Sequence, residues 1–68
     1  MKLTFHREYP KGKQYDPIYV SQDGRYEIHK HYFGMGYTYD VYKEEVYKYT
    51  ADTLQDARHF AQAYENSL

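Results

Sequence analysis

Two histidines separated by one residue are the clearest candidates in this sequence for side chains that could bind a metal. In the stretch His29-Lys30-His31, an extended backbone would place both imidazoles on one strand face, about 7 Å apart. Two imidazole nitrogens can bind a transition metal, but such a site requires a third or fourth ligand. Glu27 or His6 could supply one, yet no spacing in the chain demands either. We therefore interpret the histidines as ordinary surface residues and predict no metal and no cofactor.

Side chains that could act as nucleophiles lack the local context that catalysis needs. Ser21 and Ser67 lie in no strand–turn–helix nucleophile motif, and the chain has no glycine-rich loop for phosphate. A domain of 68 residues is also too thin to enclose a water-excluding pocket on the order of several hundred Å³. We predict that the protein is not an enzyme.

Composition restricts the partners and the compartment. The formal net charge is −1, which argues against strong non-specific binding of nucleic acid. There is no cysteine, which suits a reducing cytoplasm. No apolar run approaches the length of a membrane span. We therefore expect a cytoplasmic protein without a membrane partner.

The elements that must position any site follow from turn residues and apolar periodicity. Leu3 and Phe5 alternate with polar residues, as in an edge strand. The prolines and charged residues that follow indicate a loop, and Asp23-Gly24 indicates a turn. Near the C-terminus the apolar residues change to a helical stripe, with Thr53 and Asp56 at the spacing of a capping box. The expected elements are an edge strand at 1–6, a loop at 7–17, hairpins at 18–33 and 37–50, and a helix at 54–65.

The register of the first hairpin can be argued from its apolar residues. A three-residue loop ending at Gly24 would pair Val20 with Tyr26 and Ile18 with Ile28. A two-residue loop would instead set Val20 opposite a glutamate. Since a one-residue slip exchanges the two faces of a strand, we favour the first register.

The second hairpin allows the same argument. A three-residue loop, Lys43-Glu44-Glu45, would pair Val41 with Tyr47 and Tyr39 with Tyr49 on one face. On the other face it would place Asp40 opposite Lys48, a favourable cross-strand pair.

These elements predict an α+β fold: a small two-layer domain with an antiparallel sheet of three to four strands packed on one C-terminal helix. Eleven of the 68 residues are tyrosines, and most would form the core, because a tyrosine ring covers a large area while its hydroxyl reaches solvent. We expect the helix-facing tyrosines to be Tyr26, Tyr32, Tyr37, Tyr39, Tyr47 and Tyr49.

The opposite face of the sheet is the candidate binding surface. A solvated face would normally carry Thr, Lys, Glu and Ser, whereas this one would mix aromatic rings, histidines and charges of both signs. Tyrosine and arginine are enriched at binding hot spots. The predicted partner-binding residues are Tyr19, Arg25, His29, His31, Asp40, Tyr42 and Lys48.

Within residues 18–64, the motif SQDGRYEI is followed by an aromatic strand and then by TADTLQDARHFAQAY. This order resembles that of a type of small protein found in bacteriophages and mobile elements. Some proteins of this type are inhibitors of host defence, including anti-CRISPR proteins. The resemblance implies a phage-type protein that binds and inhibits a host protein in the host cytoplasm, for example by occupying a nucleic-acid-binding groove.

The chain also resembles the arm-type DNA-binding domains of integrases, which are three-stranded sheets with a C-terminal helix. That resemblance implies a sequence-reading or non-specific DNA-binding domain that uses the same sheet face. Those domains read DNA with Arg and Lys, whereas this face would set Arg25 and Lys48 beside Glu27 and Asp40. Protein binding is therefore the leading hypothesis and nucleic acid the alternative, and we favour a monomer over a homodimer.

Overall fold

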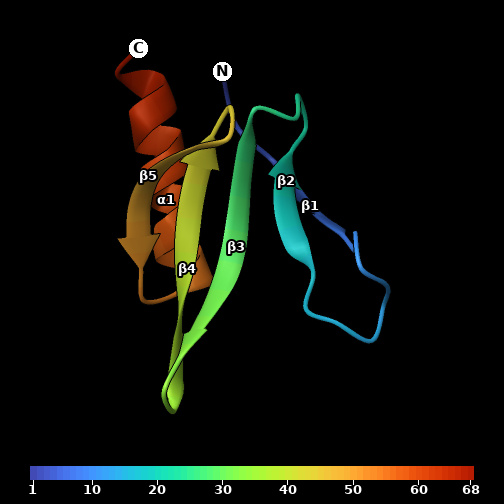
Figure 1. Ribbon diagram of the computed structural model, residues 1–68. Coiled ribbons are helices and arrows are strands. Elements are labelled where there is room, and N and C mark those ends of the chain that lie inside the picture. Colours follow the sequence, from blue (N-terminus) through green and yellow to red (C-terminus); the bar gives the residue numbers. More distant parts are fainter.

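The computed structural model describes residues 1–68 and contains five strands followed by one helix (Figure 1). In chain order the elements are β1 (Phe5–Glu8), β2 (Ile18–Ser21), β3 (Tyr26–Phe33), β4 (Gly36–Lys43), β5 (Val46–Ala51) and α1 (Leu54–Asn66).

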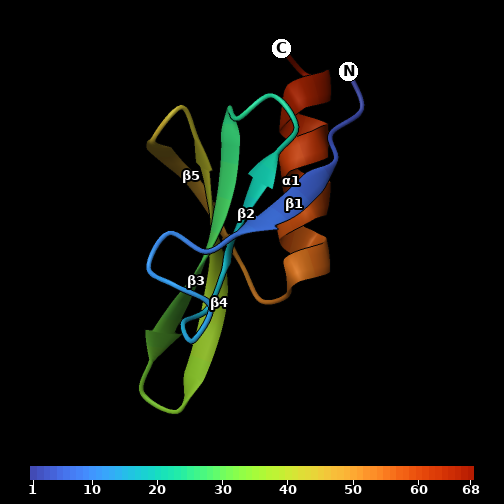
Figure 2. The ribbon, with the colours of Figure 1, turned by 90° about the vertical axis from the view of Figure 1, so that its right-hand side faces the viewer.

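The strands form one antiparallel sheet in the order β1-β2-β3-β4-β5, so each strand pairs with its neighbours in sequence. Figure 2 shows α1 on one side of this sheet, with the β3–β4 hairpin extending past the N-terminal end of the helix. The predicted two-layer α+β fold is confirmed, with five strands in place of three to four. The extra strand arises because the N-terminal segment and both hairpins join a single meander.

The core lies between α1 and the three strands β3, β4 and β5. Tyr26, Ile28 and Val41 are fully buried there. On the helix, Ala57 and Ala61 are fully buried as well, and their small side chains let the helix approach the sheet closely. Aromatic packing continues at the margin, where the rings of Tyr49 and Phe60 stack with centroids 4.2 Å apart.

The helix begins where the sequence predicts. Thr53 has an extended backbone, and its side chain accepts a hydrogen bond from the backbone N–H of Asp56 at 3.1 Å. This bond satisfies one of the donors that the first turn of a helix leaves unpaired.

The predicted register of the first hairpin is wrong. Val20 lies opposite Glu27 and Tyr19 lies opposite Ile28, so each β2 side chain occupies the face opposite to the predicted one. Tyr19 is consequently packed against the core, whereas the buried Val20 lies outside the core cluster, on the other side of the sheet.

Side-chain hydrogen bonds in the turn explain this register. The fully buried Ser21 accepts from the backbone N–H of Tyr26 at 3.0 Å and donates to the Asp23 carboxylate at 2.7 Å. The same carboxylate accepts from the backbone N–H of Arg25 at 3.2 Å. Ser and Asp side chains often organise turns in this way, and here they hold residues 22–25 in the loop.

The predicted register of the second hairpin is also wrong. Lys43 pairs with Val46, so Glu44 and Glu45 alone form the turn. Their φ angles are 51° and 68°, and positive φ at both central positions is what a two-residue type I′ turn requires. Glycine or asparagine usually occupies such positions, so two glutamates gave no signal for this turn.

A β-bulge then shifts the rest of β5. Tyr42 pairs with Tyr47, but the next residue of β4, Val41, pairs with Tyr49. The extra residue in β5 is therefore Lys48. Farther along, Asp40 lies opposite Thr50 and not opposite Lys48.

Four tyrosines predicted for the core are exposed, among them Tyr49, which stacks on Phe60 but is 42% exposed. Tyr47 is 54% exposed and shares the face of Tyr42, because the two-residue turn reverses its direction. Tyr32 and Tyr37 lie on the same side of the sheet as the helix, but they pair with each other next to the β3–β4 turn. This end of the hairpin extends past the helix (Figure 2). The two tyrosines are 58% and 46% exposed.

Candidate functional site: an uncovered sheet face and the end of one hairpin

The side of the sheet away from α1 carries a row of connected polar and aromatic side chains. We call it the open face and define it by Glu27, His29, His31, Phe33, Thr38, Asp40, Tyr42, Tyr47 and Thr50.

Aromatic contacts cross three strands of the open face. The His29 ring meets the Tyr42 ring edge-on, with centroids 5.0 Å apart. Tyr42 in turn meets Tyr47, with centroids 6.0 Å apart and planes inclined by 70°. Because these contacts follow neighbouring strands, they form one continuous aromatic strip across β3, β4 and β5.

Hydrogen bonds hold several of these side chains in place. His29 Nε2 lies 2.8 Å from a carboxylate oxygen of Glu27. At the other edge, the Tyr47 hydroxyl lies 2.6 Å from the Thr50 hydroxyl, which donates to Asp40 at 2.9 Å. A surface whose rotamers are already fixed loses less conformational entropy on binding.

The end of the β3–β4 hairpin is the most apolar exposed part of the molecule. We call it the hairpin tip and define it by Tyr32, Phe33, Met35 and Tyr37, all of which are exposed. Lys30 Nζ lies 4.1 Å from the centroid of the Tyr37 ring and 5.4 Å from that of Tyr32. The Tyr32 hydroxyl also donates to Asp16 of the preceding loop, which fixes one side of the tip.

The structure brings together four of the seven residues predicted for partner binding. His29, His31, Asp40 and Tyr42 share the open face, as predicted. The other three lie elsewhere, two of them, Tyr19 and Lys48, because both registers were wrong. Tyr19 packs against the core, and the ammonium of Lys48 lies 5.3 Å from the ring of Tyr64 on the helix.

Arg25, the third displaced residue, serves a structural network between the β2–β3 loop and the end of α1. Its guanidinium donates to Asp23 at 2.7 Å and to Glu65 at 2.9 Å. Glu65 also accepts from the hydroxyl of the buried Tyr26 at 2.9 Å. The network therefore ties the start of β3 to the last turns of the helix.

The charges of this network follow from its hydrogen bonds. Bonds from Ser21 and Arg25 lower the pKa of Asp23 to about 2, and bonds from Arg25 and Tyr26 lower the pKa of Glu65. Burial and the bond to Glu65 raise the pKa of Tyr26 to about 12. At neutral pH both carboxylates are thus ionised and paired, while the tyrosine is neutral.

His29 and His31 do not belong to a group of three or more metal-ligating side chains. His29 Nε2 is hydrogen bonded to Glu27. No three His, Asp or Glu side chains come close enough together to hold an ion.

Sequence reasoning missed Tyr47 and Thr50, which complete the open face. The predicted register placed Tyr47 on the helix side, and it set Thr50 opposite Thr38 although Thr50 pairs with Asp40. The hairpin tip was missed in a different way, since its two tyrosines, Tyr32 and Tyr37, were predicted to be covered by the helix. The Gly34-Met35-Gly36 turn signal indicates where the hairpin ends but not how far it extends beyond the helix.

Comparison with known proteins gave no match to a protein-family model, to a curated protein or to a solved structure. The single helix of the protein is neither long nor apolar enough to cross a membrane.

Proposed function

We propose that this protein is a small non-enzymatic domain that binds another protein through the open face and the hairpin tip. The observation that carries the proposal is the exposure of large aromatic side chains at both ends of the β3–β4 hairpin. Tyr47, beside the strand end at Tyr42, is 54% exposed, and Phe33 at the other end is 55% exposed, next to the exposed Tyr32, Met35 and Tyr37 of the tip. Exposed aromatic surface of this kind, with polar groups between, is typical of protein interfaces.

The polar part of the open face fits the same role. Glu27, Asp40 and two histidines surround the aromatic strip, and they offer hydrogen bonds at fixed positions. Tyrosine supplies large contact area at low cost in conformational entropy. Binding through such a surface needs no pocket and no reactive group.

The identity of the partner as a host protein is supported by the resemblance of residues 18–64 to small phage proteins. We accordingly propose inhibition of a host defence protein as the biological role. The alternative of DNA binding through this face gains no support from its charge, because none of the residues that define the open face is Lys or Arg.

Affinity capture with matched tyrosine variants tests the proposal. Wild-type protein, Tyr47→Ala and Tyr15→Ala would be immobilised and exposed to a bacterial lysate treated with nuclease. Tyr15 is also exposed, at 55%, but lies in the loop between β1 and β2 and outside the defined surface. We expect a protein that is captured by wild type and Tyr15→Ala and lost with Tyr47→Ala.

Thermal melts of the same variants provide the control for folding, since an exposed tyrosine should leave stability nearly unchanged. Equal capture by all three proteins would contradict the proposed surface. Recovery of nucleic acid alone from an untreated lysate would contradict protein binding.

A further inference from the structure

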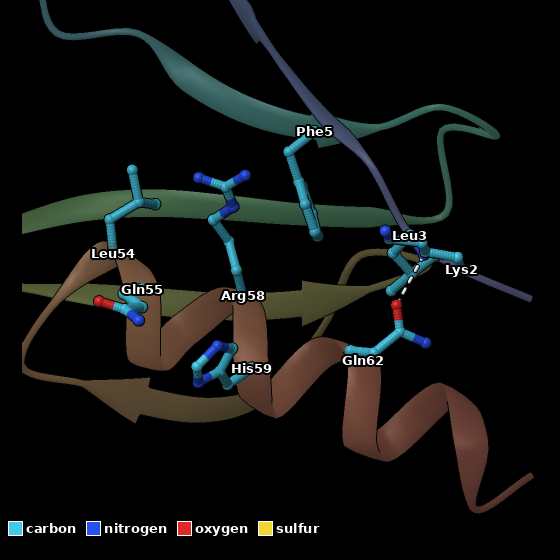
Figure 3. A pocket seen from close by; sticks show the side chains of 8 residues that line it. All are labelled: Lys2, Leu3, Phe5, Leu54, Gln55, Arg58, His59 and Gln62. Atoms are coloured by element: carbon cyan, nitrogen blue, oxygen red, sulfur yellow. Dashed lines mark hydrogen bonds between the residues drawn. The ribbon is translucent and has the colours of Figure 1, made fainter.

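A second surface lies on the helix side of the sheet and is independent of the open face. Helix α1 packs on β3, β4 and β5, so it leaves the sheet edge at β1 without a cover. Between this edge and the helix runs a groove of about 610 Å³ (Figure 3). Its lining residues are Lys2, Leu3, Phe5, Leu54, Gln55, Arg58, His59 and Gln62.

The groove combines an apolar floor with a basic rim. Leu3, Phe5 and Leu54 supply the apolar side chains, and Figure 3 shows Arg58 extending between Leu54 and Phe5. Lys2 and His59 add further nitrogen groups, and no lining residue is acidic.

The cations of the groove have no partner within the protein. Neither Lys2 nor Arg58 forms an ion pair, although other charged residues, such as Arg25, are paired. A carboxylate entering the groove would therefore meet cations that it does not have to share.

The wall of the groove on the β1 side is an open strand edge. The backbone carbonyl of Thr4 faces β2, because it accepts a hydrogen bond from the backbone N–H of Gln22 at 3.0 Å. In a strand, the backbone N–H and C=O groups of successive residues face opposite edges. The backbone groups of Leu3, Phe5 and Arg7 therefore face the outer edge, away from β2. The sheet ends at β1, and no strand pairs with this outer edge.

The side chain of Gln62 already occupies part of this strand edge with an amide group. Its side-chain amide accepts from the backbone N–H of Leu3 at 2.7 Å and donates to the carbonyl of Met1 at 2.9 Å. The amide thus pairs with the edge as a peptide group of a neighbouring strand would. Arg58 precedes Gln62 by one helical turn on the same stripe, beside the part of the edge that remains unpaired.

We propose that the groove binds an extended acidic peptide segment of a partner protein, which adds to the outer edge of β1. Backbone hydrogen bonds would form at Phe5 and Arg7, in the manner of β-strand addition. An apolar side chain of the segment contacts Phe5 and Leu54, and its carboxylates pair with Arg58 and Lys2. A strand edge selects a polypeptide over nucleic acid, because only a peptide backbone offers matching donors and acceptors.

Selection from a displayed library of random peptides tests this site. Immobilised wild-type protein would be the target, with counter-selection on Arg58→Glu, a change at an exposed residue whose side chain forms no ion pair within the protein. We expect enriched peptides that combine Asp or Glu with an apolar residue. Absence of enrichment, or enrichment without acidic residues, would overturn the proposal.

The best enriched peptide, synthesised with a fluorescent label, then locates the contact. We expect binding at least tenfold weaker for Arg58→Glu and unchanged within about twofold for Lys13→Glu, a charge reversal of equal size outside the groove; a tenfold change corresponds to about 1.4 kcal/mol. Tyr47→Ala should bind the peptide like wild type, so failure of the open-face proposal would leave this result unaffected. Equal binding by Arg58→Glu and wild type would overturn the site.

Hydrogen exchange of the backbone distinguishes strand addition from contact by side chains alone. The amides of Phe5 and Arg7 should exchange more slowly when the peptide is bound. If the peptide binds without protecting them, strand addition is wrong. If a single-stranded oligonucleotide protects the groove as well as the peptide does, the ligand class is wrong.

Discussion

The turn between β4 and β5 should be a point of stored backbone strain, which substitution can release. Glu44 and Glu45 have φ angles of 51° and 68°, where a side chain costs about 1–2 kcal/mol per residue because Cβ approaches the carbonyl oxygen. Asparagine tolerates this region and glycine prefers it, but glycine also gains about 0.5–1 kcal/mol of freedom in the unfolded chain.

We therefore expect the double variant Glu44→Asn, Glu45→Gly to be more stable than wild type by about 1–2 kcal/mol. For a domain of this size each kcal/mol raises Tm by about 4–8 °C, so the expected increase in Tm is about 5–15 °C. Circular dichroism during heating, together with urea unfolding at 25 °C, measures the change.

The matched control is Glu44→Gln, Glu45→Gln, which removes the same two charges and keeps the unfavourable φ values. Its Tm should stay close to that of wild type, because the turn is exposed and the Lys43–Glu44 ion pair is a surface pair. A gain in the glutamine variant equal to that of the Asn-Gly variant would show charge repulsion as the cause. An Asn-Gly variant no more stable than wild type would refute the strain argument.

Three further predictions concern the network at the end of the helix, the N-terminal segment and the core. Because the pKa of Asp23 is about 2, against an ordinary 3.8, and that of Glu65 is also lowered, their contribution to stability is complete above about pH 4.5. This stabilisation should be lost as the pH falls toward 2, which urea unfolding midpoints measured across that range would show. The variant Glu65→Gln should have a stability that depends less on pH. Gln62→Ala should cost about 1–2 kcal/mol through its two bonds to the N-terminal backbone, with faster exchange of the amides before β1. Val41→Ala should cost about 2 kcal/mol in urea unfolding because Val41 is fully buried, whereas Val46→Ala, at a residue 54% exposed, should be nearly neutral.

The helix and the fold class could be predicted because their signals are local. The apolar stripe and the capping side chain of Thr53 depend only on residues close together in the sequence. The observed helix extends only one residue beyond the predicted end. Asp23-Gly24 and Gly34-Met35-Gly36 likewise indicate turns irrespective of what the strands pair with.

Strand register could not be predicted because it depends on how the turns are built. Ser21 fixes the first turn through a hydroxyl that is buried only in the folded chain, and Glu44-Glu45 adopts a conformation that its residue types disfavour. Apolar matching also assumed a single buried face, whereas Val20 is buried on the other side. These local departures moved Tyr47 onto the open face and Tyr19 away from it.

The helix supports only part of the long β3–β4 hairpin, and this should divide the hairpin into two regions of different mobility. Tyr26 and Ile28 are fully buried at one end of β3, whereas Tyr32 and Phe33 at the other end are more than half exposed. Local opening is easiest where few apolar contacts are lost. Amide exchange should therefore slow progressively along a single strand from the tip toward the helix.

This gradient has a consequence for the partner binding that we propose for the tip. A segment that opens without unfolding the domain can adjust its aromatic side chains to surfaces of different shape. The adjustment has an entropic cost, since every contact made by the tip must also order it. In the function that we propose, a pre-ordered strip at Tyr42 and Tyr47 is joined to an adaptable end at Met35, which would favour tolerance of variation in the target over the highest affinity for one form of it.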